Sequence, residues 1–293
     1  MSTTRTHALV TGATNGIGLA IARRLAAEGF TVTLVGRAPA RLQAARRTIL
    51  AAVPNATLHL ECADFARLDD VRALGARLGA GPLPDVVISN AATVAPLDAV
   101  TVDGLQRTLA VNHLAPYLLL RLLTNALGDH PARLVVVGAD PVGLAGNPVD
   151  LEALDAPPQH PDLPPALAPF ALYGRTKNMN VMTIYALARR LRDRPITVNG
   201  AHPGIVRGTG LAKECPEVQA AVAEYFKLDL DALPGPDAGA DTPVWLATAP
   251  EVEGVSGQFF VERQPVATAP HTTDVERCER LWTISARLVG LEP

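Results

Sequence analysis

A tyrosine and a lysine stand four residues apart in the segment YGRTK, at positions 173–177. At this spacing Tyr173 and Lys177 share one face of a helix. A lysine ammonium beside a phenol favours the phenolate, and we expect it to bring the pKa of Tyr173 down from ~10 towards neutrality. The pair could then give a proton to a carbonyl oxygen or remove one from an alcohol.

A glycine-rich turn near the start of the chain predicts a nucleotide site. The segment TGATNGIG, at 11–18, lies between the strand-like run HALV and a helical pattern over 17–28. Its glycines allow a tight turn and close approach of the backbone to a pyrophosphate at the helix N-terminus. The predicted cofactor contacts in this turn are Gly12, Thr14, Asn15, Gly16, Ile17 and Gly18.

The end of the second predicted strand indicates which dinucleotide is bound. An acidic residue at this position would accept hydrogen bonds from the ribose 2′-hydroxyl of NAD. The sequence has Gly36 and Arg37 instead, and Arg41 follows one helical turn later. A guanidinium suits a 2′-phosphate, so the expected cofactor is NADP(H).

Composition limits the other classes of function. The 293 residues are 48% hydrophobic and 19% charged, with a net charge of −3 and only 4% aromatic residues, which disfavours nucleic-acid binding. No apolar stretch is long enough to span a bilayer. The three cysteines are far apart, and no histidine spacing suggests a metal site. We expect a soluble cytoplasmic protein that acts on a small molecule, without metal, membrane or nucleic acid.

Short apolar runs recur along the chain and alternate with helical patterns. Continuous apolar runs suit parallel strands that are buried on both faces. The sequence therefore predicts one Rossmann-type α/β domain over 1–293, with a doubly wound, mostly parallel sheet of about seven strands and helices on both faces. The predicted strands are 7–10, 31–35, 57–60, 85–89, 133–137, 196–200 and 257–261.

A proline-rich insertion interrupts this alternation at about 141–169. It contains eight prolines, which exclude a regular helix or a central strand. Long ordered loops are often lids or binding loops, so we expect this one to form a wall of the pocket. The C-terminal region, about 205–293, is expected on the substrate side.

Together these motifs resemble the short-chain dehydrogenase/reductase family. TGATNGIG is similar to its TGxxxGxG turn, SNAA at 89–92 to its NNAG stretch, YGRTK to YxxxK, and HPG at 202–204 to its proline-glycine turn. The resemblance is closest to the retinol-dehydrogenase-like branch, as judged from the segments YGRTKNMNVMTIYALARRL and AHPGIVRGTGLA. The resemblance covers nearly the whole chain and leaves the substrate open.

The resemblance implies roles for individual residues. Tyr173 would be the catalytic acid or base, Lys177 would also bind the nicotinamide ribose, and Asn112 would hold a water in the proton relay. His113 and His202 lie inside motifs and are expected to be structural. Further cofactor contacts are implied at Asp64, Phe65, Asn90, Ala91, Pro203 and Gly204.

One position departs from the family pattern. The family's fifth strand ends in a serine pair whose second member donates a hydrogen bond to the substrate oxygen, whereas RLVVV at 133–137 is followed by Gly138 and Ala139. Losing such a donor typically costs ~3–4 kcal/mol. Three explanations stay open: Asp140 or an insertion residue replaces the serine, a substrate hydroxyl does so, or the reaction is not ordinary redox chemistry. Ala139 and Asp140 are the predicted substrate-side residues.

The leading hypothesis is NADPH-dependent reduction of a ketone on a bulky, apolar small molecule. The alternatives are a non-redox dehydratase, isomerase or cyclase that uses Tyr173 as acid or base, and a cofactor-sensing binding protein. An alanine- and proline-rich composition, with far more arginine than lysine, is typical of a high-GC bacterium and favours specialised metabolism. Homo-oligomer formation through helices at about 101–125 and 173–192 stays open.

Overall fold

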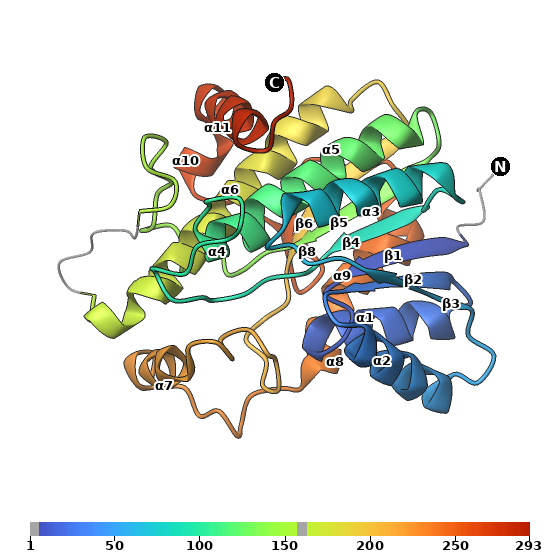
Figure 1. Cartoon of the computed structure of the whole chain (residues 1–293), viewed down its shortest axis with the longest axis horizontal. Helices are drawn as coiled ribbons and strands as arrows, with labels where there is room; N and C mark the ends of the chain where they lie inside the picture. Colours follow the sequence, from blue (N-terminus) through green and yellow to red (C-terminus); the bar gives the residue numbers. More distant parts are fainter. Residues whose placement is uncertain (1–5, 157–162) are drawn as a thin grey trace.

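One eight-stranded sheet organises the computed structural model, which describes residues 6–156 and 163–293 (Figure 1). Its order is β3-β2-β1-β4-β5-β6-β7-β8, with neighbours parallel except for the antiparallel pair β7 and β8. The strands are β1 (His7–Thr11), β2 (Thr31–Gly36), β3 (Leu58–Cys62), β4 (Val86–Ser89), β5 (Ala132–Val137), β6 (Ile196–His202), β7 (Phe259–Val261) and β8 (Gln264–Val266). The predicted doubly wound, mostly parallel sheet is confirmed.

The eighth strand is the element that the sequence did not predict. It forms a hairpin with β7 through Glu262 and Arg263, which have positive φ angles of 49° and 64°. Two-residue hairpin turns of this kind usually select asparagine or glycine. Because neither is present and the three-residue strand contains Pro265, the sequence carries little hairpin signal.

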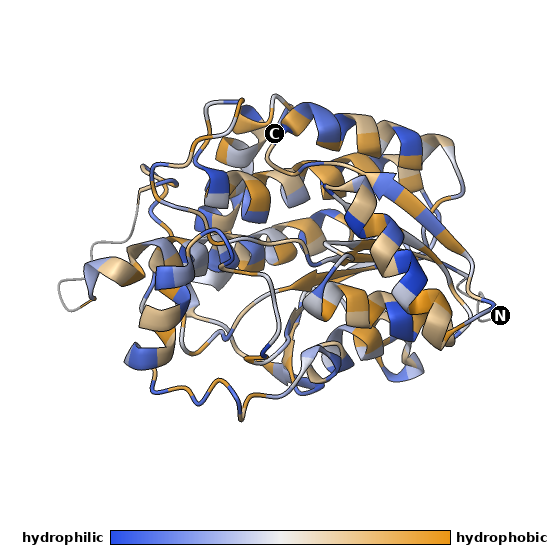
Figure 2. Cartoon of the chain, turned by 60° about the horizontal axis from the view of Figure 1, so that its bottom comes forward, coloured by the Kyte–Doolittle hydropathy of each residue, from blue (hydrophilic) through white to orange (hydrophobic). Residues whose placement is uncertain are grey.

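Helices cover both faces of the sheet (Figure 1). Hydrophobic residues follow the strands and the helix faces that pack on them, and each face has its own core (Figure 2). One face carries α1 (Gly16–Ala27), α2 (Pro39–Ala52), α8 (Pro236–Gly239) and α9 (Asp241–Thr248). The other carries α3 (Leu68–Ala80), α4 (Arg107–Leu109), the π-helix η1 (Ala110–Leu114), α5 (Ala115–Leu127), α6 (Ala168–Arg190) and α11 (Val275–Leu288). Shorter or peripheral helices are η2 (Pro165–Leu167), α7 (Pro216–Tyr225), η3 (Pro250–Val252) and α10 (Pro270–Thr273).

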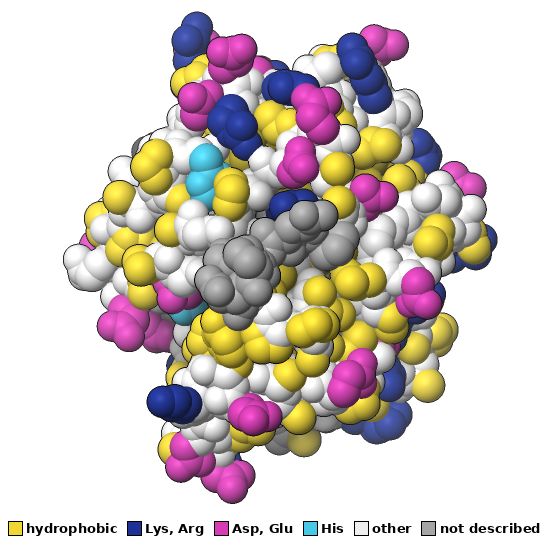
Figure 3. Space-filling view, turned by 90° about the vertical axis from the view of Figure 1, so that its left-hand side faces the viewer, with side chains coloured by type: hydrophobic (Ala, Val, Ile, Leu, Met, Phe, Trp, Pro, Cys, Tyr) yellow, Lys and Arg dark blue, Asp and Glu magenta, His cyan; other side chains and the backbone are white. Residues whose placement is uncertain are grey.

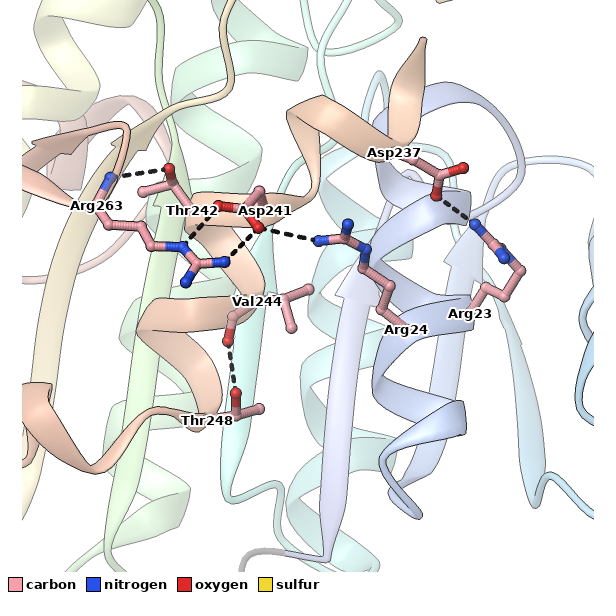
Figure 4. Close-up of polar contacts among 8 residues, drawn as sticks. All are labelled: Arg23, Arg24, Asp237, Asp241, Thr242, Val244, Thr248 and Arg263. Atoms are coloured by element: carbon pink, nitrogen blue, oxygen red, sulfur yellow. Dashed lines mark hydrogen bonds and ion pairs between the residues drawn. The ribbon is translucent and has the colours of Figure 1, made fainter.

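Ion pairs fasten the C-terminal helices α8 and α9 to α1 (Figure 4). Asp241 accepts hydrogen bonds from Arg263 Nε at 2.7 Å and from Arg24 Nη1 at 3.5 Å, while Arg23 pairs with Asp237. The hydrogen bond from Arg263 is the main cause that lowers the pKa of the Asp241 carboxyl below its usual value. These contacts fix α1, whose first residues lie at the carboxyl edge of the sheet.

The proline-rich insertion packs along α6. From 141 to 156 it consists of turns, bends and irregular backbone. Pro157, Pro158 and Pro161 lie outside the described residues, and α6 already begins at Ala168. Asn178 on α6 donates to the carbonyl oxygens of Leu144 and Asn147, at 3.0 and 2.7 Å. The insertion therefore braces the helix that carries Tyr173 and Lys177.

The C-terminal region serves several parts of the fold. Only its first part, about 205–225, lies beside the site described below. Helices α8 and α9 pack on α1, β7 and β8 extend the sheet, and α11 packs on α6. Across residues 6–156 and 163–293, no helix is both long and apolar enough to cross a membrane.

Candidate active site

A cleft of about 250 Å³ opens where the strand order reverses, between β1 and β4. In doubly wound sheets this switch point, at the carboxyl ends of the strands, is where ligands bind. The predicted residues that line it are Gly12, Thr14, Asn15, Gly16, Ile17, Gly18, Arg37, Asp64, Phe65, Asn90, Ala91, Tyr173, Lys177 and Pro203, with Arg41 beside them. Gly204 and Asn112 do not line the cleft.

The glycine turn has the conformation that a dinucleotide site requires. Gly12 and Gly16 have positive φ angles of 66° and 53°, and a Cβ on Gly18 would collide with the Gly12 carbonyl oxygen. Asn90 Nδ2 donates to the Thr11 carbonyl oxygen at 2.9 Å and ties the turn to the end of β4. The first turn of α1 carries no acidic residue, so its N-terminal N–H groups are suited to a pyrophosphate.

One part of the cleft is strongly basic. Arg37 and Arg41 line it as expected, and the structure adds Arg107 from α4 and Lys213. Glu214 bridges two of these cations: Arg37 and Arg107 each donate to its carboxylate at 3.1 Å. Burial acts to raise the pKa of Glu214, but the two arginine hydrogen bonds outweigh it and hold the pKa below its usual value. The set fits an anion such as a 2′-phosphate.

Tyr173 and Lys177 lie together in the cleft and are almost fully buried. Lys177 Nζ donates to the Val137 carbonyl oxygen at 2.9 Å and lies 5.5 Å from the centre of the Tyr173 ring. Burial lowers the pKa of Lys177 to about 8 and raises the pKa of Tyr173 above its usual value. The expected downward shift for Tyr173 is therefore wrong in this structure, because desolvation of the phenol dominates. Tyr173 keeps its proton at neutral pH, which suits a proton donor.

Asn112 lies behind the cleft and holds the segments around it together by hydrogen bonds. Its Oδ1 accepts from the Thr93 N–H at 2.8 Å, and its Nδ2 donates to the Thr93 carbonyl at 2.9 Å and to Thr176 Oγ1 at 3.2 Å. The Asn112 carbonyl oxygen accepts from Asn180 Nδ2 at 2.9 Å. Asn112 thus links Thr93, which lines the cleft, to the helix that carries Tyr173.

The end of β5 brings no side-chain hydroxyl to the cleft. Gly138 lines it, and a Cβ there would lie 2.7 Å from the Phe259 ring, so packing requires glycine. Ala139 packs in a small apolar cluster with Tyr173. Asp140 is exposed, and its Oδ1 accepts from the backbone N–H two residues further on, at 2.9 Å. The equivalence of Ala139 to the family's serine stays a prediction.

An apolar wall covers Tyr173 on the side of α7. The Leu211 carbonyl oxygen accepts from the Val94 N–H at 2.9 Å, and both residues pack in the cluster around Tyr173. Phe170 stacks on Tyr173 with ring centres 5.5 Å apart and contacts Phe226, which is 51% exposed. The side of the molecule that carries α7 presents hydrophobic side chains to solvent (Figure 3). No group of His, Cys, Asp or Glu in the described chain could hold a metal ion.

Comparisons with known proteins decide the family. A family model described as short chain dehydrogenase matches residues 6–148. The chain is 36% identical to the "Putative daunorubicin C-13 ketoreductase DnrU" of Streptomyces sp. (strain C5), over 96% of this chain and 92% of that protein. The chain belongs to the short-chain dehydrogenase family.

Further matches agree with the branch and with the fold. This dehydrogenase is 31% identical to retinol dehydrogenase 13 of Mus musculus, over 97% of this chain and 83% of the relative. A protein structure from Mycobacterium paratuberculosis matches with a TM-score of 0.74 and 25% identity, over 99% and 94% of the two chains. A short chain dehydrogenase from Burkholderia cenocepacia J2315, solved in complex with NADP, matches with a TM-score of 0.66 and 27% identity, over 87% and 95%. The retinol-dehydrogenase-like assignment is confirmed.

Proposed function

We propose that this dehydrogenase reduces a ketone on a bulky, apolar small molecule, with NADPH as the hydride donor. The observation that carries the proposal is one cleft that contains both Arg37 and the Tyr173–Lys177 pair. The relative named as a ketoreductase and the neighbour solved with NADP support it. The reaction would turn a carbonyl into a secondary alcohol.

Different residues of the cleft would bind the different parts of the cofactor. The N–H groups at the start of α1 would bind the pyrophosphate, and the basic side chains Arg37, Arg41 and Arg107 would bind the 2′-phosphate. Lys177 would hold the nicotinamide ribose, as the family resemblance implies. Bound NADPH supplies the hydride, and the protein supplies position and charge.

Tyr173 would deliver the proton that completes the reduction. As the carbonyl carbon gains a hydride, its oxygen gains negative charge and takes the phenolic proton of Tyr173. The Lys177 ammonium stabilises the phenolate that remains, since it lies beside the ring. Asn112 positions this machinery through its bonds to Thr93 and Thr176. Positioned acids of this kind contribute roughly 10²–10⁴ in rate.

The surroundings of Tyr173 favour an apolar substrate. The side chains that pack beside it come from the segment 205–225, from the residues that follow β4 and β5, and from the start of α6. An apolar wall excludes water and binds substrate by surface burial, at roughly 25 cal/mol per Å². The residues of this wall are Ala92, Val94, Ala139, Phe170, Leu211, Ala212, Cys215, Val218 and Val222.

A panel of polycyclic and aliphatic ketones tests the proposal. Wild-type protein should oxidise NADPH with bulky apolar ketones and should use NADH less well. Arg37→Gln should reduce the preference for NADPH by roughly ten- to hundredfold, since a hydrogen bond to a charged group contributes ~1.5–3 kcal/mol. Arg46→Gln, an exposed change elsewhere on α2, is the control and should keep the preference. No oxidation of NADPH by any ketone, or equal use of both cofactors, would contradict the proposal.

A further inference from the structure

Glu214 lies beside the basic part of the cleft and pairs with two of the arginines that line it. Its carboxylate is 21% exposed and bridges Arg37, from the end of β2, to Arg107, from α4, with both contacts at 3.1 Å. These are the arginines that a 2′-phosphate entering this part of the cleft would meet. A carboxylate and a phosphate cannot both sit between them, because like charges at that distance repel.

The two arginines keep unused hydrogen-bonding capacity. Each donates one N–H to Glu214, and within the described residues the Arg107 Nε–H is buried with no acceptor. Unpaired buried donors are rare and costly. A phosphate has three acceptor oxygens and nearly twice the charge of a carboxylate, so it satisfies both guanidinium groups better than Glu214 does.

Glu214 also belongs to the segment that covers the catalytic tyrosine. Thr209 lies against Gly16 of the glycine turn. The Leu211 carbonyl oxygen accepts a hydrogen bond from the Val94 N–H, in the loop that follows β4. Leu211 packs in the apolar cluster with Tyr173, three residues before Glu214. The segment 205–215 is therefore held at both the turn and the tyrosine, and Glu214 fastens its end to the arginines.

We propose that Glu214 is a positioning residue whose carboxylate competes with the cofactor's 2′-phosphate for Arg37 and Arg107, so that phosphate binding releases the segment 205–215 over Tyr173. The inference rests on the proposed use of NADP(H). The coupling is reciprocal, because any ligand that displaces Glu214 loosens the segment, and loosening the segment strengthens binding of that ligand. No bond is made or broken in this exchange.

We call the release of the segment 205–215 by competition at Glu214 the latch. Two nucleotides that differ by one phosphate test the latch separately from the cofactor preference. Calorimetry would compare 2′,5′-ADP with 5′-AMP in the wild type, in Glu214→Gln, and in Glu217→Gln. Glu217 is an exposed acid in the first turn of α7, so this variant is a matched loss of charge. Glu214→Gln should bind 2′,5′-ADP roughly three- to tenfold more tightly than the wild type does. The affinity for 5′-AMP, and both affinities of Glu217→Gln, should match the wild type.

The outcomes for the two proposals differ. If neither the wild type nor Glu214→Gln prefers 2′,5′-ADP over 5′-AMP, the NADP preference and the latch both fail. If the wild type prefers 2′,5′-ADP but Glu214→Gln binds it no more tightly, the NADP preference stands and the latch fails. A fall in 5′-AMP affinity in Glu214→Gln, with 2′,5′-ADP unchanged, would instead make Glu214 a ribose-binding residue and overturn the proposal.

Hydrogen exchange gives a readout that needs no nicotinamide. In ligand-free protein, amides of 208–215 should exchange faster in Glu214→Gln than in Glu217→Gln. Adding 2′,5′-ADP, which cannot reach Tyr173, should speed exchange of the same amides in the wild type, and 5′-AMP should not. Slower or unchanged exchange of these amides with 2′,5′-ADP bound would overturn the release of the segment.

Discussion

His113 should make the stability of this dehydrogenase fall steeply in mild acid. The ring is fully buried, with Nε2 2.7 Å from Ser285 Oγ and Nδ1 3.2 Å from Asn180 Oδ1. Burial lowers the pKa of His113 from 6.5 to about 4. Between about pH 6.5 and pH 4, the unfolded chain therefore binds a proton on His113 that the folded chain does not bind. The stability that neutral His113 contributes is complete above about pH 6.5 and is lost as the pH falls towards 4.

The size of this effect follows from the two pKa values. At pH 5 the unfolded histidine is almost fully protonated and the folded one almost neutral, so the free energy of unfolding falls by about 2 kcal/mol relative to neutral pH. Denaturant unfolding at pH 7.5 and pH 5.0 measures it. His113→Gln cannot take up this proton, so its stability should fall about 2 kcal/mol less than that of the wild type over the same interval.

A second histidine provides the control for this experiment. His59 is exposed on β3, and His59→Gln should keep the wild-type difference between the two pH values. Lower stability of His113→Gln at pH 7.5 is expected, since the substitution removes bonds to two helices, and it does not affect the comparison. An equal fall with pH in His113→Gln and the wild type would refute the reasoning.

Three further predictions concern the cleft. The pKa of about 8 for Lys177 predicts that kcat/KM for NADPH is level below pH 8 and falls about tenfold per pH unit above it, as the ammonium is lost; a level profile to pH 9.5 would contradict this. Gly18→Ala should lower the free energy of unfolding by about 1–3 kcal/mol in denaturant titrations and weaken NADPH binding in calorimetry, because its methyl group would overlap the Gly12 carbonyl oxygen; unchanged binding would show that the turn does not contact the cofactor. Ala139→Ser should raise kcat about tenfold in steady-state assays by restoring a donor near Tyr173, whereas an unchanged kcat would show that this position is not the family's serine.

The sequence predicted the parts of the fold that depend on local pattern. Seven strands and the glycine turn follow from continuous apolar runs and from glycines at positions that need positive φ, such as Gly12 and Gly16. The lining of the cleft by Arg37 followed from the same logic, because the end of β2 has a fixed place in a doubly wound sheet.

Other parts of the site depend on contacts between distant segments. Glu214 meets Arg37 across 177 residues and Arg107 across 107, and no local pattern predicts either pair. The one weak signal for Arg107 in the sequence was its position five residues before Asn112. The upward pKa shift of Tyr173 was missed for a similar reason: it results from burial under the segment 205–225, and the spacing to Lys177 does not reveal that burial.

Transfer of label from deuterated NADPH to a ketone tests the central claim most directly. The wild type and Tyr173→Phe would be mixed with NADPH deuterated at the transferable position and a bulky apolar ketone, and the products analysed by mass spectrometry. Tyr173→Phe should bind NADPH as tightly as the wild type in calorimetry. The account predicts deuterium on the carbinol carbon of the wild-type product and a rate in Tyr173→Phe lower by roughly 10²–10⁴. Product without deuterium, or labelled alcohol formed by Tyr173→Phe at the wild-type rate, would contradict it.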